Sequence, residues 1–287
     1  MFTSRATLII PKNRVNRAAP GPPRAPIFGG FWRLHSFWDE ATPGWAGVGG
    51  PHDRSGSVES AAVWLVRVMK LVIANKNYSS WSLRAWLLLR EAGIPFEEEI
   101  IGFNTPDFSE HVQRYSPVGH VPVLVDGEAV VWDSLAIAEY LAETFPDKKL
   151  WPDARLARAR ARSICAEMHA GFAHLRNRMP MNCDASLPLG RLEIAVQRDI
   201  DRVVQIWDDA RTSYGSDGPF LFGRFSIADA YFAPVVWRLV TYGIPLPAPA
   251  NAYVETMCGL ASMKDWLAGA RAEKDFVAFD EPYRRHR

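Results

Sequence analysis

The sequence is poor in cysteine and lacks a long hydrophobic run. Its 287 residues include three cysteines, and no two of them form a Cys-x-x-Cys pair. An odd number of cysteines without paired spacing argues against a disulfide framework and favours a reducing environment. The most apolar stretch, residues 61–71, is interrupted by Arg67 and Lys70 and falls short of the roughly 20 residues that span a membrane. These absences predict a soluble, cytoplasmic protein.

A large excess of charge of one sign is also missing. The formal net charge is +1, which excludes a strongly cationic nucleic-acid binder and a long acidic tail. The charge is unevenly spread, because residues 1–68 hold eight Lys or Arg against four Asp or Glu, leaving 25 against 28 for residues 69–287. We therefore expect a mildly acidic main body whose partners include neither nucleic acid nor a membrane.

Residues 1–68 show no sustained hydrophobic period and are interrupted by Pro and Gly. This composition predicts an unstructured N-terminal extension. An organellar transit peptide is an alternative, because the segment before Arg33 has no acidic residue and contains five spaced basic ones. Those basic residues are Arg5, Lys12, Arg14, Arg17 and Arg24. A start site placed upstream of the folded protein accounts for the segment without any targeting role.

From Met69 onward, short apolar runs alternate with helical patterns. Gly93 followed by Pro95 predicts the end of the first helix, and Asp126-Gly127 predicts a two-residue hairpin turn. The order is strand, helix, strand, helix, two strands, helix. The expected strands are residues 70–74, 96–101, 121–125 and 129–132, and the expected helices are residues 81–92, 106–115 and 134–144.

After Trp151 the sequence predicts only helices and loops. Apolar residues at helical spacing indicate helices over residues 154–176 and 189–211. A third helix is expected to begin at Ser226, because Asp229 stands three positions later, where a capping box places its acidic partner. The fold class is therefore an α/β domain followed by an all-α domain.

Four local features stand in a characteristic order along this pattern. They are Ser79-Ser80 at a strand-to-helix turn, Val121-Pro122, Asp133-Ser134, and the box from Ser226 to Asp229. In this order and spacing they resemble the cytosolic glutathione transferase family, serine-type and similar to its zeta and theta branches. The resemblance covers residues 69–287. It implies a thioredoxin-like domain over residues 69–149, a helical bundle over residues 150–287, glutathione in the cleft between them, and a homodimer.

The resemblance also implies that a serine hydroxyl stabilises the glutathione thiolate. A free thiol has a pKa of about 8.5, which falls near the partial positive charge of a helix N-terminus. Counting back from Gly93 assigns this role to Ser79, whereas counting from Arg84 favours Ser80. The alternative is that both serines merely cap the helix. Because residues 79–82 contain no cysteine, we do not expect disulfide reduction through an enzyme thiol.

Five residues are implied to bind glutathione. Asp133 and Ser134 are expected to receive its γ-glutamyl end, since the start of a helix suits a carboxylate and Asp133 suits an amino group. Val121 precedes Pro122, the proline that the family holds in cis, and its backbone is expected to pair with the cysteinyl part of the ligand. His120 occupies a position that contacts the backbone or the glycyl end of glutathione in relatives. Ordinary helix capping and a surface histidine are the alternatives.

The acceptor pocket is expected to border the first long helix of the second domain. Its predicted members are Tyr78, Trp81, Met168, Phe172 and Arg176. We expect no metal site, because the two histidines of this region lie five residues apart and have no further ligand motif beside them.

The function implied is conjugation of the glutathione thiolate to a small hydrophobic electrophile. Glutathione would serve as co-substrate, and no tightly bound cofactor is expected. A zeta-like, glutathione-dependent isomerase is an alternative. A further alternative is a binding or interaction module of the same fold that has no catalytic turnover.

Overall fold

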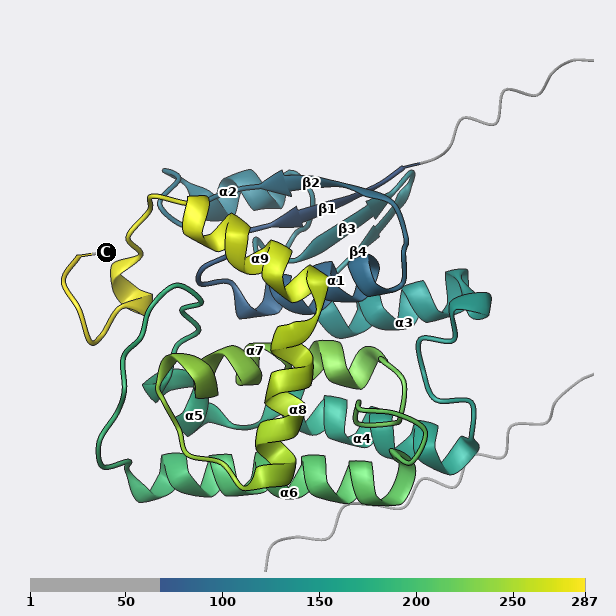
Figure 1. The fold of residues 1–287 in the computed structure, drawn as a ribbon. Coiled ribbons are helices and arrows are strands. Elements are labelled where there is room, and N and C mark those ends of the chain that lie inside the picture. The colour runs from purple at the N-terminus through teal and green to yellow at the C-terminus, as the bar shows by residue number, and fades with distance from the viewer. Residues whose placement is uncertain (1–67, 287) are drawn as a thin grey trace, which may run out of the picture. The chain divides into compact units, whose positions relative to one another are not determined.

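The computed structural model describes residues 68–286 (Figure 1). The predicted N-terminal extension, with its transit-peptide interpretation, lies outside the described residues except for Val68.

A four-stranded mixed sheet forms the first part of the fold. Its strands are β1 (Met69–Ile73), β2 (Phe96–Ile100), β3 (Val123–Asp126) and β4 (Ala129–Val131), arranged in the order β2-β1-β3-β4. β1 runs parallel to β2 and antiparallel to β3, and β3 and β4 form the predicted hairpin. Gly127 in its turn has a positive φ of 57°, which glycine adopts without strain. β3 begins after Val121 and Pro122, so these two residues belong to the preceding loop.

Helix α1 (Ser80–Glu91) lies under this sheet and joins the two halves of the molecule. It begins and ends one residue earlier than predicted, and Gly93, predicted to stop it, has a φ of 62°. Its side chains from Ser82 to Leu89 are all buried, because α1 packs against both α3 (Ser134–Thr144) and α7 (Ile227–Thr241). Short α2 (Phe108–Gln113) lies on the opposite face of the sheet (Figure 1).

The remaining helices form the second part of the fold, below α1 and α3 in Figure 1. α7 is buried along almost its whole length at the centre of this layer, as expected of a helix that is apolar on every side. The other elements are η1 (Pro146–Lys148), α4 (Arg155–Ala170), α5 (Ala173–Arg178), α6 (Ile194–Tyr214), α8 (Ala248–Gly259), α9 (Ala261–Ala272) and η2 (Ala278–Asp280). The predicted class, a thioredoxin-like domain followed by a helical domain, is confirmed.

Two predicted helix boundaries are wrong. The helix expected over residues 154–176 is two helices, because the chain turns at Gly171 and at Phe172, whose φ is 59°. The helix expected from residue 189 begins at Ile194. The residues before it are held in another way, since the N–H groups of Leu187 and Leu189 donate to the carbonyls of Thr241 and Tyr242.

The capping box at the start of α7 is confirmed. Asp229 accepts hydrogen bonds from the backbone N–H and the hydroxyl of Ser226, at 2.9 and 3.0 Å. Its other oxygen accepts from the Leu221 N–H and the Tyr253 hydroxyl, both at 3.0 Å. Burial nevertheless raises the pKa of Asp229 to about 6.

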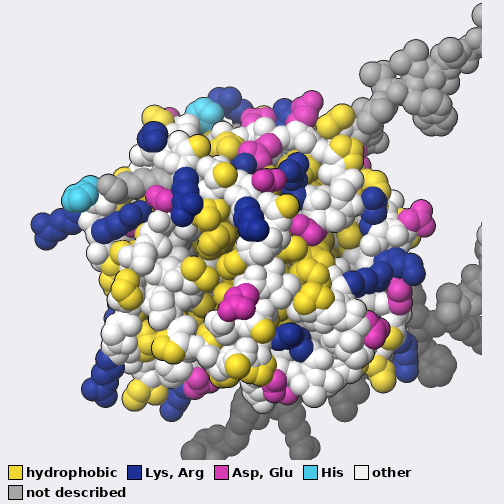
Figure 2. All heavy atoms as spheres, viewed as in Figure 1, with side chains coloured by type: hydrophobic (Ala, Val, Ile, Leu, Met, Phe, Trp, Pro, Cys, Tyr) yellow, Lys and Arg dark blue, Asp and Glu magenta, His cyan; other side chains and the backbone are white. Residues whose placement is uncertain are grey.

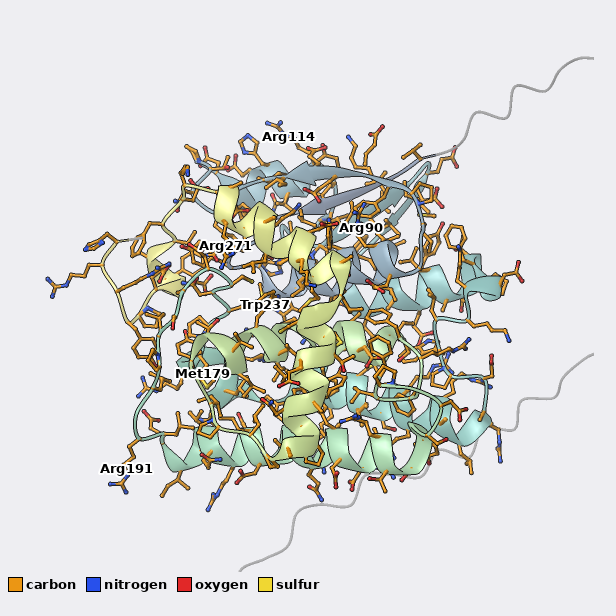
Figure 3. All side chains as sticks on the ribbon, viewed as in Figure 1. Arg90, Arg114, Met179, Arg191, Trp237 and Arg271 are labelled. Atoms are coloured by element: carbon orange, nitrogen blue, oxygen red, sulfur yellow. The ribbon has the colours of Figure 1, made fainter. Side chains whose placement is uncertain are left out.

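The C-terminal segment returns to the first part of the fold. Arg90 on α1 forms an ion pair with Asp265 on α9 at 3.0 Å (Figure 3). Beyond α9, Glu273 accepts the backbone N–H groups of Lys76 and Asn77, at 2.5 and 3.2 Å. The loop between β1 and α1 is therefore held by the C-terminal segment.

Candidate functional site

A cavity of about 400 Å³ lies where the loop ends of the sheet meet the helical domain. Its walls combine the start of α1, the loop before β3, the start of α3 and the end of α4. The lining residues are Ser79, Trp81, Phe103, Phe108, His120, Val121, Pro122, Asp133, Ser134 and His169. A larger hollow of about 510 Å³ runs along α6, but its walls include no helix start from the sheet domain and none of the predicted site residues.

Ser79 lies in the cavity wall at the N-cap position of α1, with 4% of its surface exposed. Its hydroxyl makes no capping hydrogen bond to the helix. It donates instead to the Ser82 hydroxyl at 2.7 Å, and Ser82 also accepts the Ala74 N–H at 3.2 Å. The hydroxyl of Ser79 is therefore held at a helix start without being used to cap it.

Ser80 is turned toward the helical domain. Its hydroxyl oxygen lies 3.4 Å from Nη2 of Arg238, a buried residue of α7. Ser80 is not among the residues that line the cavity. The two neighbouring serines thus occupy different surroundings, and Ser79 alone of the pair faces the cavity.

The loop before β3 forms a second wall. The Val121-Pro122 peptide bond is cis, as the resemblance implied. Val121 and buried Pro122 line the cavity together with the exposed side chain of His120. This wall presents chain backbone beside the start of α1.

The start of α3 forms the third wall and contacts the helical domain. Asp133 caps α3 by accepting the Leu135 N–H at 3.0 Å, and its second oxygen lies 3.2 Å from Nε2 of His169. Ser134 is 1% exposed, and its hydroxyl lies 3.1 Å from the hydroxyl of Tyr231 on α7. Both residues that were predicted to receive the γ-glutamyl group therefore stand in the cavity, and each is linked to a side chain of the second domain.

Tyr78, predicted for the acceptor pocket, points away from the cavity. It is 3% exposed and donates its hydroxyl to Glu281 at 2.8 Å. Burial and this hydrogen bond raise the pKa of Tyr78. Tyr78 therefore helps to hold the loop that carries Ser79 against the C-terminal segment.

Of the other predicted acceptor residues, only Trp81 lines the cavity. Met168 and Phe172 are buried in the core, and half-buried Arg176 lies behind Trp81, 5.5 Å from its ring centroid. The prediction assumed one straight helix through residue 176. Because the chain turns at Gly171, residues spaced at helical intervals across that point do not share one face.

Three lining residues carried no sequence signal that we used. Phe103 lies in the loop after β2 and Phe108 is the first residue of α2, and their ring centroids lie 5.2 Å apart. His169 stands at the end of α4, where its ring meets Trp81 edge-on at 5.1 Å. We expected the neighbouring Met168 to face the cavity. A helix that borders a cleft can present either of two adjacent residues to it, and here it presents His169.

Within residues 68–286, no group of three or more His, Cys, Asp or Glu side chains is placed to hold a metal ion. None of the helices in this range is both long and apolar enough to cross a bilayer.

Comparison with known proteins identifies the family. Residues 78–144 match the family model "Glutathione S-transferase, N-terminal domain", and residues 153–272 match "Glutathione S-transferase, C-terminal domain". A similar solved structure is that of a glutathione transferase homolog from Burkholderia with bound glutathione. It shares 26% identity at a TM-score of 0.56, over 71% of this chain and 99% of that chain.

Curated relatives carry several names. A stringent starvation protein A homolog of Haemophilus ducreyi is 29% identical over 181 residues, which is 62% of this chain and 78% of the relative. A probable maleylacetoacetate isomerase of Caenorhabditis elegans is 33% identical over 102 residues, which is 36% of this chain and 47% of the relative. Since both domain models match in order along a fold that has this architecture, the chain belongs to the glutathione transferase family.

Proposed function

We propose that the protein binds glutathione in this cavity and conjugates it, through its thiolate sulfur, to a small electrophile. The observation that supports this most directly is the Ser79 hydroxyl. It stands at the start of α1 in a cavity whose other walls are Val121-Pro122 and Asp133-Ser134. A relative of the same fold was solved with glutathione bound.

The proposed chemistry is stabilisation of a thiolate. The helix start favours the anionic sulfur, and a hydroxyl that donates to sulfur favours it further. To donate a hydrogen bond to the sulfur, the Ser79 O–H must turn away from the Ser82 hydroxyl, whose oxygen lies 2.7 Å from the Ser79 oxygen. Ser82 has a proton of its own and can then donate it to the Ser79 oxygen, so the pair stays hydrogen-bonded while the charge forms.

We assign the remaining parts of glutathione to the other two walls. The amino group of the γ-glutamyl end would meet Asp133, and its carboxylate would meet Ser134 and the N–H groups at the start of α3. The backbone of Val121 would pair with the cysteinyl residue, and His120 would meet the glycyl end. Trp81, Phe103 and Phe108 then remain to hold an apolar part of the electrophile.

Substitution of the two serines tests the assignment. Ser79→Ala should lower turnover with a chloronitrobenzene acceptor at least tenfold, while the dissociation constant of glutathione stays within about threefold, because the hydroxyl acts on the charged sulfur. Ser80→Ala is the matched control and should retain turnover. Equal activity of wild type and Ser79→Ala would refute the role of Ser79.

Two other outcomes point to other functions. Glutathione binding without turnover on any electrophile would favour a binding module. Turnover of a cis-olefinic acid without consumption of glutathione would favour an isomerase, the activity named for the nematode relative. We further propose that residues 69–287 suffice for glutathione binding and assemble as a homodimer, which titration calorimetry and sedimentation of a chain without residues 1–68 would test.

A further inference from the structure

Three arginines from three different helices converge behind one side of the cavity. The guanidinium of Arg84, on α1, lies 4.2 Å from the ring centroid of Trp81, and that of Arg176, on α5, lies 5.5 Å from it. Arg238, on α7, approaches Ser80 at 3.4 Å. Trp81 lines the cavity and Ser80 follows the lining residue Ser79. The arginines thus stand directly behind the part of the cavity wall that we assign to the electrophile.

None of these arginines has a carboxylate at ion-pair distance among residues 68–286. Arg84 is 3% exposed, and its Nε and Nη1 atoms have no hydrogen-bond partner within that range. Its neighbour Tyr231 faces the guanidinium with a ring 4.6 Å away. Most buried charges in proteins are paired, so this arrangement is unusual.

The other two arginines are held by neutral groups. Arg238 is 5% exposed and donates to the carbonyls of Met179 and Pro234, at 2.7 and 3.2 Å. Met179 follows α5 directly and is labelled in Figure 3. Arg176 donates to the carbonyl of His169 at 3.3 Å. Carbonyl oxygens satisfy N–H groups without cancelling the positive charge.

The surrounding titratable groups leave the cluster electropositive. Burial and the neighbouring arginines lower the pKa values of Arg84 and Arg238, each to about 10, so both remain charged at neutral pH. Burial raises the pKa values of Tyr231 and Cys165, which face Arg84, so both stay neutral. Two carboxylates act on the cluster from a greater distance: Asp133, which is paired with His169, and Asp280, which faces Arg238.

The face of the molecule seen in Figure 2 carries both signs of charge. Figure 2 shows Lys and Arg side chains interspersed with Asp and Glu over the face viewed, with apolar patches between them. A concentrated positive field beside a cavity attracts an anion into that cavity, because low-dielectric walls screen the charge less than water does.

We propose that the electrophile carries an anionic group, such as a carboxylate, in addition to its apolar part, and that Arg84, Arg176 and Arg238 provide the field that selects it. This inference rests on the proposed function. Arg176 is half-buried and so the most exposed of the three, whereas Arg84 and Arg238 are buried, and all three act on the acceptor through the field behind Trp81 and Ser80. In the reaction, the thiolate sulfur forms a bond to the electrophilic carbon; with a halogenated acceptor, the carbon–halogen bond breaks and its electron pair leaves with the halide.

Binding of two glutathione conjugates to the full-length protein tests this without requiring turnover. The probes are S-benzylglutathione and S-(4-carboxybenzyl)glutathione, which differ only in the acceptor carboxylate, and titration calorimetry gives both dissociation constants. We expect the carboxylated conjugate to bind at least fivefold more tightly. Arg176→Gln should reduce this preference to less than twofold while leaving the affinity for S-benzylglutathione within twofold. Arg198→Gln, an exposed arginine on α6, is the control and should keep the preference.

The possible results distinguish a failure of this inference from a failure of the proposed function. If the two conjugates bind equally well, the anionic acceptor is refuted, although glutathione binding stands. If Arg176→Gln weakens both conjugates by the same factor, the cluster serves the glutathione part, and the inference is again refuted. If neither conjugate nor glutathione binds, the proposed function fails and the inference with it. A preference that declines from 50 to 500 mM salt supports the electrostatic cause.

Discussion

The two sides of the cavity are built in different ways. On the sheet side, the lining residues stand at junctions between strands and helices or beside a cis proline, so the backbone itself forms much of the wall. On the helical side, His169 is the lining residue, and Arg176 and Arg238 approach Trp81 and Ser80 of α1, where Arg84 also lies.

This difference separates recognition of a constant ligand from recognition of a variable one. A wall made of backbone and helix starts is fixed by the fold, which suits glutathione. A wall made of side chains that protrude from helices can change by substitution while the helices keep their packing. The acceptor preference of this protein should therefore depend on protruding side chains, which include Trp81, Phe103 and Phe108 as well as those of the helical side, and each prediction below tests how independent the two sides are.

The largest expected effect would show that the sheet side depends on the C-terminal segment. Glu281 is 3% exposed and accepts hydrogen bonds from Tyr78, Asn182 and Arg284, at 2.8, 2.9 and 2.6 Å. Glu281→Ala leaves these donors without their acceptor, so we expect a loss of about 3 kcal/mol in the free energy of unfolding. Urea denaturation measures this loss.

Glu281→Gln is the matched control, since it keeps the shape and one acceptor oxygen, and it should lose less than half as much stability. A loss below about 1 kcal/mol for Glu281→Ala would mean that the loop carrying Ser79 is independent of this anchor.

The next effect concerns the charge of the same segment. Burial raises the pKa of Asp280 to about 6, although the nearby Arg238 opposes this shift. The unfolded pKa is about 3.9, so the folded protein binds the proton more readily. Stability from this group is therefore fully present below pH 3.9 and is lost as pH rises through about 6. The Asp280→Asn variant has no carboxyl group to titrate at this position, so it should not show this pH-dependent loss of stability.

The measurement compares urea denaturation of wild type and Asp280→Asn at pH 5 and pH 8. We expect the variant to gain about 1 kcal/mol relative to wild type between these two pH values. Asp209→Asn, an exposed residue of α6, should show no such gain. A pH-independent difference between wild type and Asp280→Asn would contradict the shifted pKa.

Part of the fold and of the candidate site could be predicted from the sequence. Local signals were sufficient where neighbouring residues determine the structure: Gly93 ends α1, Asp126-Gly127 forms the hairpin turn, and Ser226 caps α7 with Asp229. The predicted glutathione residues lie in one cavity because each stands at such a local junction.

The helical side was harder to predict because its geometry depends on tertiary packing. The chain turns at Gly171 and Phe172, which changes the face that later residues present, and both Phe172 and Met168, which precedes the turn, lie in the core. The convergence of Arg84, Arg176 and Arg238 joins helices that are far apart in sequence, and no spacing rule connects them.

A direct test of the sheet side is the charge of Asp133. Asp133→Asn keeps an oxygen that can accept the Leu135 N–H, but it removes the charge proposed to meet the glutathione amino group. We expect the dissociation constant of glutathione to rise about tenfold, as loss of a charge-assisted hydrogen bond costs about 1.5 kcal/mol or more. Glutathione that lacks the α-amino group should bind wild type and variant equally. A tenfold loss with that analogue too would indicate a damaged helix start instead.

The smallest effect tests the contact between the two sides. His169 holds the second oxygen of Asp133 at 3.2 Å, so His169→Ala should leave that carboxylate with one anchor. It also removes the ring that meets Trp81 at 5.1 Å. We expect glutathione to bind about threefold more weakly, which is less than 1 kcal/mol. His169→Gln retains an N–H donor and should restore part of the affinity. If His169→Ala instead binds glutathione more tightly than wild type, the histidine competes with the ligand for Asp133, and the helical side opposes glutathione binding.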